Sequence, residues 1–225
     1  MVKGISAGRI KVISAFLLLF GPALLLIFLG TRSCEHKFMQ LEDYGEAKEY
    51  AFKTVEGTPV TTASLKDKVV LLSTLQLTCP DSCAVSVWHI DQLIYQKIRK
   101  NKNEKNAVQI VSVVTDGEGN PVDDIAPVIE MMEDNVEAYD PEVWTIVSGD
   151  AKSLYDIEHN GQTLLQKGDE YFGGEAYQEL MLLLDKNNHL RMALNGSTEG
   201  YVRRMYQHVA LLLKQYDKED AKSDR

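Results

Sequence analysis

The feature that most constrains this chain is the passage from a predicted buried strand into a predicted helix, with two cysteines at the junction. Residues 69–76 form an apolar run rich in valine and leucine and free of turn-forming residues, which predicts a buried strand. Pro80 and Asp81 suit the first turn of a helix, where a missing proline N–H needs no partner and a carboxylate interacts favourably with the helix dipole. From residue 84 to residue 101 apolar side chains recur at roughly helical spacing: Val87, Trp88, Leu93, Ile94 and Ile98.

The two cysteines at this junction, Cys79 and Cys83, form a C-x-x-x-C motif. Their spacing places the two sulfurs about one helical turn apart on one face, which suits a bridging metal as well as a disulfide. A helix N-terminus lowers the pKa of a thiol, and thiolates exchange disulfides and bind soft metals. The alternative is a pair of ordinary buried cysteines, but the whole chain has three cysteines and two of them fall here.

The motif and several later segments resemble the SCO/SenC family. Thr78-Cys79-Pro80-Asp81-Ser82-Cys83 after an apolar strand is similar to the family's T-x-C-P-x-x-C-P segment. Three further segments resemble, in the correct order, its second core strand, its W-x-x-L-T-G segment and its late Y-L-I-D strand: residues 108–113, 144–149 and 182–185. The resemblance covers about residues 50 to 215.

The resemblance implies an α/β, thioredoxin-like fold, with a central mixed sheet flanked by helices. It also implies a membrane-anchored protein linked to copper delivery to cytochrome c oxidase. On this reading Cys79 and Cys83 are the metal ligands, copper is the metal, favoured as Cu(I), and the partner is a cytochrome c oxidase subunit.

The chain departs from the family pattern at copper's third ligand. The family has a histidine in a D-H-S/T segment before the late strand, and the matching position falls near Tyr177. No histidine lies between His159 and His189. His89 points elsewhere on the predicted helix, and His189 is expected at the far end of the strand, so His159 is the only candidate replacement. The alternative for His159 is an ordinary surface histidine, which the sequence favours.

Three other residues are weaker candidates for metal ligands. Asp116 matches the first aspartate of the family's S-V-D-P-x-x-D-T segment, although the glycines after it also suit a plain acidic turn. Met131 and Met132 carry soft thioethers, but their position in a helix predicted over residues 122–135 favours core packing.

Two alternative functions stay open. Thiol–disulfide exchange by Cys79 and Cys83 would make the protein an extracytoplasmic oxidoreductase with a thiol-redox partner. The cis-proline usual in thioredoxin-like oxidoreductases is missing, because residues 175–178 contain no proline. The third hypothesis is a non-catalytic binding module that keeps a structural disulfide and acts through partners.

Residues 12–31 carry no charge and are long enough to span a bilayer as one helix. Lys3, Arg9 and Lys11 place the N-terminus on the cytoplasmic side, so the rest of the chain is expected outside the cytoplasm, on the periplasmic side. A cleaved signal peptide is the alternative, but no A-x-A-like site follows the run. A lipid on Cys34 is a further alternative, but Thr-Arg-Ser is a poor sequence to precede a lipidated cysteine.

The predicted organisation is one domain behind an anchor: a cytoplasmic N-terminus (1–11), the transmembrane anchor (12–31), a tether (32–49), the thioredoxin-like domain (50–216) and a charged tail (217–225). Within the domain we expect strands at 108–114, 143–147, 178–185 and 189–194, and a short hairpin at 52–60. We also expect a solvated loop at 101–106, a short helix from Asp150 to about 158, a long loop at 160–176, and a last helix from Ser197 or Thr198.

The net charge is −9, and since residues 1–33 carry +4, the remainder carries −13. An acidic body argues against nucleic acid as a partner.

The charge-free run predicts a single uncleaved helix. A reporter fused after Arg225 that is active only outside the cytoplasm should therefore be active, because Lys3, Arg9 and Lys11 hold the N-terminus inside. A fusion active only in the cytoplasm, or a mature N-terminus near Cys34, would contradict this topology.

Overall fold

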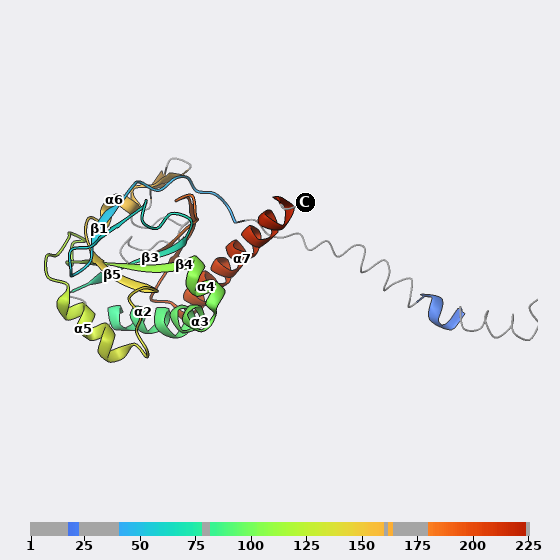
Figure 1. Cartoon of the computed structure of the whole chain (residues 1–225), viewed down its shortest axis with the longest axis horizontal. Helices are drawn as coiled ribbons and strands as arrows, with labels where there is room; N and C mark the ends of the chain where they lie inside the picture. The colour runs from blue at the N-terminus through green and yellow to red at the C-terminus, as the bar shows by residue number, and fades with distance from the viewer. Residues whose placement is uncertain (1–17, 23–40, 78–81, 160–161, 164–179, 224–225) are drawn as a thin grey trace, which may run out of the picture. The chain divides into compact units, whose positions relative to one another are not determined.

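The computed structural model of the chain describes residues 18–22, 41–77, 82–159, 162–163 and 180–223 (Figure 1). The chain divides into two compact units, Met1–Met39 and Gln40–Arg225. In the first unit residues 18–22 are helical. Among the described residues no helix is both long and apolar enough to cross a membrane, and most of the span predicted at 12–31 lies outside them.

The second unit is built on a mixed sheet, which confirms the predicted α/β architecture. In the described part its strands are arranged in the order β2-β1-β5-β4-β3-β8-β9. The strands β3, β4 and β5 are parallel, β8 is antiparallel to β3, and β9 is antiparallel to β8. Their bounds are β1 Ala51–Lys53, β2 Pro59–Thr61, β3 Val69–Gln76, β4 Val108–Thr115, β5 Trp144–Ser148, β8 Leu180–Leu184 and β9 Leu190–Asn195, and a separate hairpin pairs β6 Glu158–His159 with β7 Gln162–Thr163.

The centre of the sheet is the parallel pair β3 and β4, which are in register from Val69 opposite Val108 to Gln76 opposite Thr115. Both strands are buried almost throughout, as their continuous apolar sequences predict. Two buried serine hydroxyls of this pair are satisfied internally: Ser73 Oγ lies 2.8 Å from Ser112 Oγ, which also accepts a 2.9 Å hydrogen bond from Trp144 Nε1.

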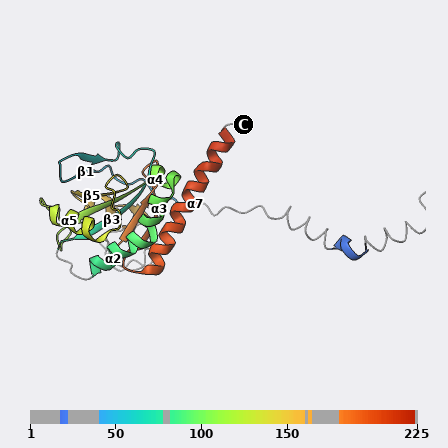
Figure 2. The same cartoon turned by 60° about the horizontal axis from the view of Figure 1, so that its bottom comes forward.

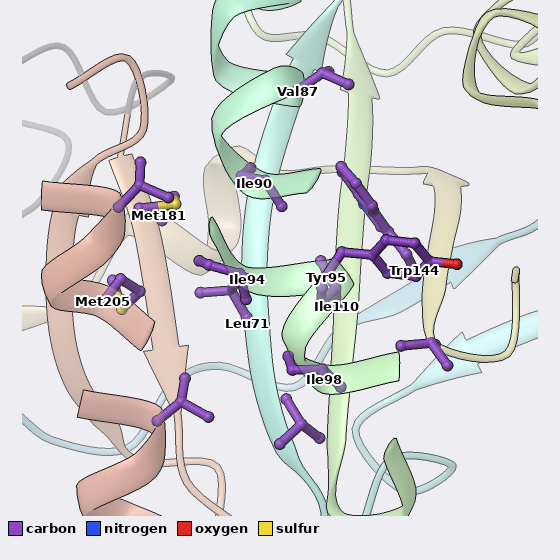
Figure 3. Close-up of a cluster of buried hydrophobic side chains, with 14 of the residues drawn as sticks. Leu71, Val87, Ile90, Ile94, Tyr95, Ile98, Ile110, Trp144, Met181 and Met205 are labelled. Atoms are coloured by element: carbon purple, nitrogen blue, oxygen red, sulfur yellow. The ribbon is translucent and has the colours of Figure 1, made fainter. Parts of the chain in front are cut away.

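Helices cover one face of this sheet (Figures 1 and 2). They are α2 Ser82–Ile90, the π-helical turn η1 Asp91–Tyr95, α3 Gln96–Lys100, α5 Ala126–Asn135 and α7 Glu199–Ser223. Figure 3 shows Leu71 and Ile110 of the sheet packed beneath Ile94, Tyr95 and Ile98 of the helical layer.

The alternate strand residues face a second cluster on the other side of the sheet. There Leu72 packs with Phe52 and with Leu154 and Tyr155 of α6, Lys152–Tyr155. This alternation explains why neighbouring leucines in β3 are all buried.

The helix predicted from the cysteines to residue 101 is present, but it contains a π-turn that the sequence did not predict. Asp91 is buried at the start of this turn, and its carboxylate accepts hydrogen bonds from Gln92 Nε2 at 2.6 Å and Gln96 Nε2 at 2.7 Å. Gln96 Nε2 also donates to the carbonyl oxygen of Glu137 at 3.0 Å. The turn therefore joins the helix to the connection between α5 and β5.

Several predicted boundaries are wrong. The expected loop at 101–106 is helix α4, Lys102–Ala107, because Asn101 caps it by accepting a 3.1 Å hydrogen bond from the Asn103 amide. Helix α5 begins at Ala126 rather than at Val122, since Asp124 Oδ1 accepts from the Ala126 amide at 3.0 Å. The helix that Asp150 was expected to cap ends at Tyr155, and α7 continues to Ser223, through most of the predicted tail.

The segment 41–49, expected as part of a tether, is instead an integral strap across the β8–β9 hairpin. Leu41, Tyr44 and Ala47 are buried, and Tyr44 N donates to Leu190 O at 2.9 Å while Leu190 N donates to Gly45 O at 2.9 Å. Arg191 donates to the carbonyl oxygens of residues 41 and 42 and pairs with the buried carboxylate of residue 185 at 3.0 Å. The charged residues between these three apolar positions concealed the packing, which backbone hydrogen bonds and the buried side chains share.

The predicted buried stripe of the last helix is confirmed: Val202, Met205, Val209 and Leu212 are buried and Tyr216 is half-buried. His208 is also buried, although the sequence did not single it out. Neither ring nitrogen of His208 has a hydrogen-bond partner in the described part of the chain.

Replacing Arg191 with methionine should lower the free energy of unfolding by about 3–5 kcal/mol, because it leaves the Asp185 carboxylate buried without its cation. Urea unfolding measures the change. The matched control is Arg203→Met, which removes an exposed pair with Glu199 and should cost less than about 1 kcal/mol. Equal losses in the two variants would show that Arg191 does not secure the strap.

Burial, with a smaller contribution from Arg204, lowers the pKa of His208. The folded state therefore binds fewer protons than the unfolded state once the pH falls below the unfolded pKa of about 6.5, so stability is lost as the pH falls. We expect His208→Leu to remove this loss, and the gap between variant and wild type to widen by at most about 1.4 kcal/mol per pH unit below that pKa. Urea unfolding across this pH range tests it, and parallel pH profiles would contradict it.

Candidate functional site

The cysteine motif lies between the end of the central strand and the start of α2, as the sequence predicted for its flanks. Strand β3 ends at Gln76, and the amide of Leu77 donates to the carbonyl oxygen of Thr115 at 3.0 Å. Helix α2 begins at Ser82, so the backbone of Cys83 lies in its first turn. Cys79 and the side chain of Cys83 lie outside the described residues, and their pairing stays a prediction.

The topology gathers other segments at the same edge of the sheet. The strands β3, β4 and β5 are parallel, so the residues that follow all three lie at this edge. Strand β9 runs in the same direction after two antiparallel steps, so α7 also starts there. Carboxyl edges of this kind are where α/β folds place their sites.

The turn after β4 is shaped by Asp116. Its Oδ1 accepts the amides of Glu118 and Asn120, each at 2.8 Å, and its Oδ2 accepts Asn120 Nδ2 at 2.9 Å. These bonds, led by the Asn120 side chain, lower the pKa of the Asp116 carboxyl. Because both oxygens are already acceptors within the turn, the structure favours the acidic-turn reading of Asp116 over the ligand reading.

One polar group at this edge was not expected. The hydroxyl of Thr115 is fully buried beside the backbone of Leu77, and it has no hydrogen-bond partner in the part of the chain that the structure describes. No feature of the sequence signals it, since a threonine at the end of a β-branched strand is ordinary.

The described histidines are not placed as a third ligand. His89 is buried on α2, its ring 5.3 Å from the Trp88 ring, and its Nδ1 is unpaired among the described residues. His189 precedes β9 at the opposite edge of the sheet, where its Nδ1 lies 2.8 Å from Asp43 Oδ2. His208 lies in the buried stripe of α7.

The two positions that matter most for the third ligand are not described. Tyr177 lies outside the described residues, and for His159 the structure gives only the backbone, which pairs with Gln162 in the β6–β7 hairpin. Within the described ranges no group of three or more His, Cys, Asp or Glu side chains could hold a metal ion.

Met131 and Met132 take part in core packing, which confirms the prediction made from their position in the helix. Met132 is fully buried in the helical-face core, and Met131 packs against that core. Packing therefore accounts for both methionines without a role in metal binding.

Comparison with known proteins gives a family match over most of the chain. The SCO1/SenC family model matches residues 39–214. None of the curated proteins matches the chain.

Several solved structures of similar fold are described as SCO proteins. A SCO1/SenC family lipoprotein from Bacillus anthracis is 19% identical with a TM-score of 0.55, covering 76% of this chain and 96% of that one. BsSco, described as a member of the Sco family of cytochrome c oxidase assembly proteins with a disulfide switch, is 17% identical with a TM-score of 0.53, covering 77% and 98%. Copper-bound ScoI from Arabidopsis thaliana is 15% identical with a TM-score of 0.50, covering 76% and 99%. At these identities the likeness establishes the fold.

Since Asp116 shapes its own turn, replacing it with alanine should speed hydrogen exchange at the Glu118 and Asn120 amides, and should not weaken the copper binding that the family resemblance implies. Asp150→Ala, which removes an exposed acceptor of the Lys152 amide, is the matched control. Loss of copper binding with both amides still protected would restore Asp116 as a ligand.

Proposed function

Because the chain belongs to the SCO1/SenC family, we propose that it is a membrane-anchored protein that uses Cys79 and Cys83 to handle copper in the assembly of cytochrome c oxidase. The family includes a protein described as a cytochrome c oxidase assembly protein and another solved with copper bound. Copper in this proposal is cargo, held and passed to an oxidase subunit.

The observation that carries the proposal is the position of the C-x-x-x-C motif between β3 and α2. A thiol in the first turn of a helix faces unpaired backbone N–H groups and the positive end of the helix dipole, which stabilise thiolate. A thiolate pair is a good donor set for a soft ion.

The donor set decides which oxidation state of copper fits. Two thiolates suffice for Cu(I), which is soft, whereas Cu(II) favours a tetragonal set that includes nitrogen or oxygen. The described histidines lie in the core or at the opposite edge, and Asp116 is engaged in its turn. These placements support a preference for Cu(I).

The anchor belongs to the same proposal. Residues 12–31 would hold the domain at the membrane, with the cysteines outside the cytoplasm. A SCO1/SenC relative is described as a lipoprotein, so a lipid on Cys34 is the alternative form of attachment. In either form the domain begins at the strap, close to residue 41.

The decisive experiment loads the reduced, full-length protein with Cu(I) under anaerobic conditions and measures the copper bound per chain. We expect about one Cu(I) per chain, and none in the Cys79→Ser/Cys83→Ser variant, because the two thiolates are the proposed donors. Binding that survives the double substitution would place the metal elsewhere.

The missing histidine predicts a second outcome for Cu(II). The wild-type protein should bind it weakly, or be oxidised to a disulfide and release the copper. Tyr177→His should restore a stable Cu(II)–thiolate species with a strong near-ultraviolet charge-transfer band. If the wild type already shows that band, Tyr177 is not the ligand position and His159→Ala is the next variant.

Thiol–disulfide exchange is the second candidate, favoured by the same motif and by the disulfide switch attributed to BsSco. It stands if Cu(I) fails to bind while both thiols are reduced and Cys79 and Cys83 still exchange with a disulfide substrate. If neither reaction occurs, the remaining function is that of a binding module with a structural disulfide.

A further inference from the structure

Three large apolar side chains are exposed on both sides of the cysteine motif. Leu77 precedes Cys79 by two residues and is 42% exposed, and Val85 follows Cys83 by two residues and is 44% exposed. Trp88 is 57% exposed, although its spacing predicted a place on the buried face of the helix. The residues on both sides of the motif therefore expose apolar surface to water, which is unfavourable.

These side chains are not needed for the core. The inner face of α2 packs through Val87 and Ile90, which are buried beneath the helix (Figure 3). Val85 and Trp88 are three residues apart and so share a different face of the same helix. Tryptophan is the residue type most enriched among the energetic centres of protein interfaces, and a half-exposed tryptophan beside a reactive motif marks a contact surface.

One part of the same edge, the turn and connection after β4, is acidic. In the turn and connection after β4, Glu118, Asp123 and Asp124 are exposed. Among the described residues that follow β4 and β5 at this edge, the only cation is Lys152, and its Nζ is bound to Asn120 Oδ1 at 2.9 Å. The acidic connection leads into α5, which lies on the same face of the sheet as α2 (Figures 1 and 2).

We propose that Leu77, Val85, Trp88, Glu118, Asp123 and Asp124 form a docking surface for a protein partner with an apolar centre and a basic rim. The inference rests on the proposed function, because it names the partner that the cysteine motif serves. The apolar residues supply the contact, and the carboxylates select positive charge and accelerate encounter. A partner with an acidic rim is rejected by like charge.

The test uses a synthetic peptide in place of the partner. Its single cysteine is joined to 2-thiopyridine as a mixed disulfide and flanked by leucines and lysines, and a second peptide has glutamates for the lysines. One thiolate of the protein attacks the peptide sulfur and expels pyridine-2-thione. The second thiolate then attacks that mixed disulfide and releases the peptide thiol, so the pair loses two electrons and the disulfide of the probe is reduced.

With the full-length protein in detergent, the basic peptide should react about tenfold faster than the acidic one at low salt, and the difference should vanish near 1 M salt. Trp88→Ala, and separately the triple variant Glu118→Gln/Asp123→Asn/Asp124→Asn, should remove most of the preference for the basic peptide. Both variants should react normally with the small neutral disulfide 2,2′-dithiodipyridine.

Two matched controls lie elsewhere on the chain. Val55→Ser removes an exposed apolar side chain of the β1–β2 turn. The triple variant Glu133→Gln/Asp134→Asn/Asp217→Asn changes the charge by the same amount on exposed positions of α5 and α7. Both should behave as the wild type.

A separate binding measurement distinguishes failure of the docking surface from failure of the proposed cysteine site. A basic, leucine-containing peptide without cysteine should shift the indole N–H resonance of Trp88 and leave that of the buried Trp144 unchanged. Failure to react with 2,2′-dithiodipyridine would count against the cysteine motif while this shift still supports the surface. Equal rates for the two peptides, or no shift at Trp88, would overturn the docking surface.

Discussion

The rest of the structure depends on the parallel pairing of β3 and β4. Its register sets Gln76 beside Thr115, so Leu77 and the Asp116 turn leave the sheet side by side. The pairing is buried on both faces, and its hydroxyls at Ser73 and Ser112 are satisfied within it. A rigid, dry centre of this kind is a firm support for the residues that follow each of its strands.

Around this centre the protein separates structural from reactive polar groups. Asp91, Asp185 and Asp116 are carboxylates whose oxygens are occupied by named donors, so none is available to a ligand without breaking local structure. The groups that face outward at the cysteine edge are different in kind, since Trp88 and Glu118 are exposed. This difference is consistent with the proposal that the thiols carry out the chemistry at this edge and that the exposed side chains around them select the partner.

The strands and helices that depend on apolar runs or apolar periodicity were predicted from the sequence, whereas the elements that depend on particular hydrogen bonds were missed. The central strands and the stripe of α7 follow from uninterrupted or periodic apolar residues, and the match to the family confirmed the fold. The strap at 41–49 buries a few apolar side chains within a charged segment and is secured by backbone bonds and by Arg191. Helix α4 depends on the cap at Asn101, which apolar periodicity does not reveal. For the site, the motif and its flanks were predictable, but the exposure of Trp88 depends on which face of α2 the core already uses.

The central claim is that the junction of β3 and α2 makes the cysteine pair a reactive thiolate site. It is tested most directly by the pH dependence of alkylation at Cys79 and Cys83 in the reduced full-length protein, resolved by mass spectrometry of the two peptides. The account predicts that at least one thiol has a pKa below the ordinary value of about 8.5, because the helix N-terminus stabilises thiolate. Two thiols with ordinary or raised pKa values would contradict it and identify the pair as structural.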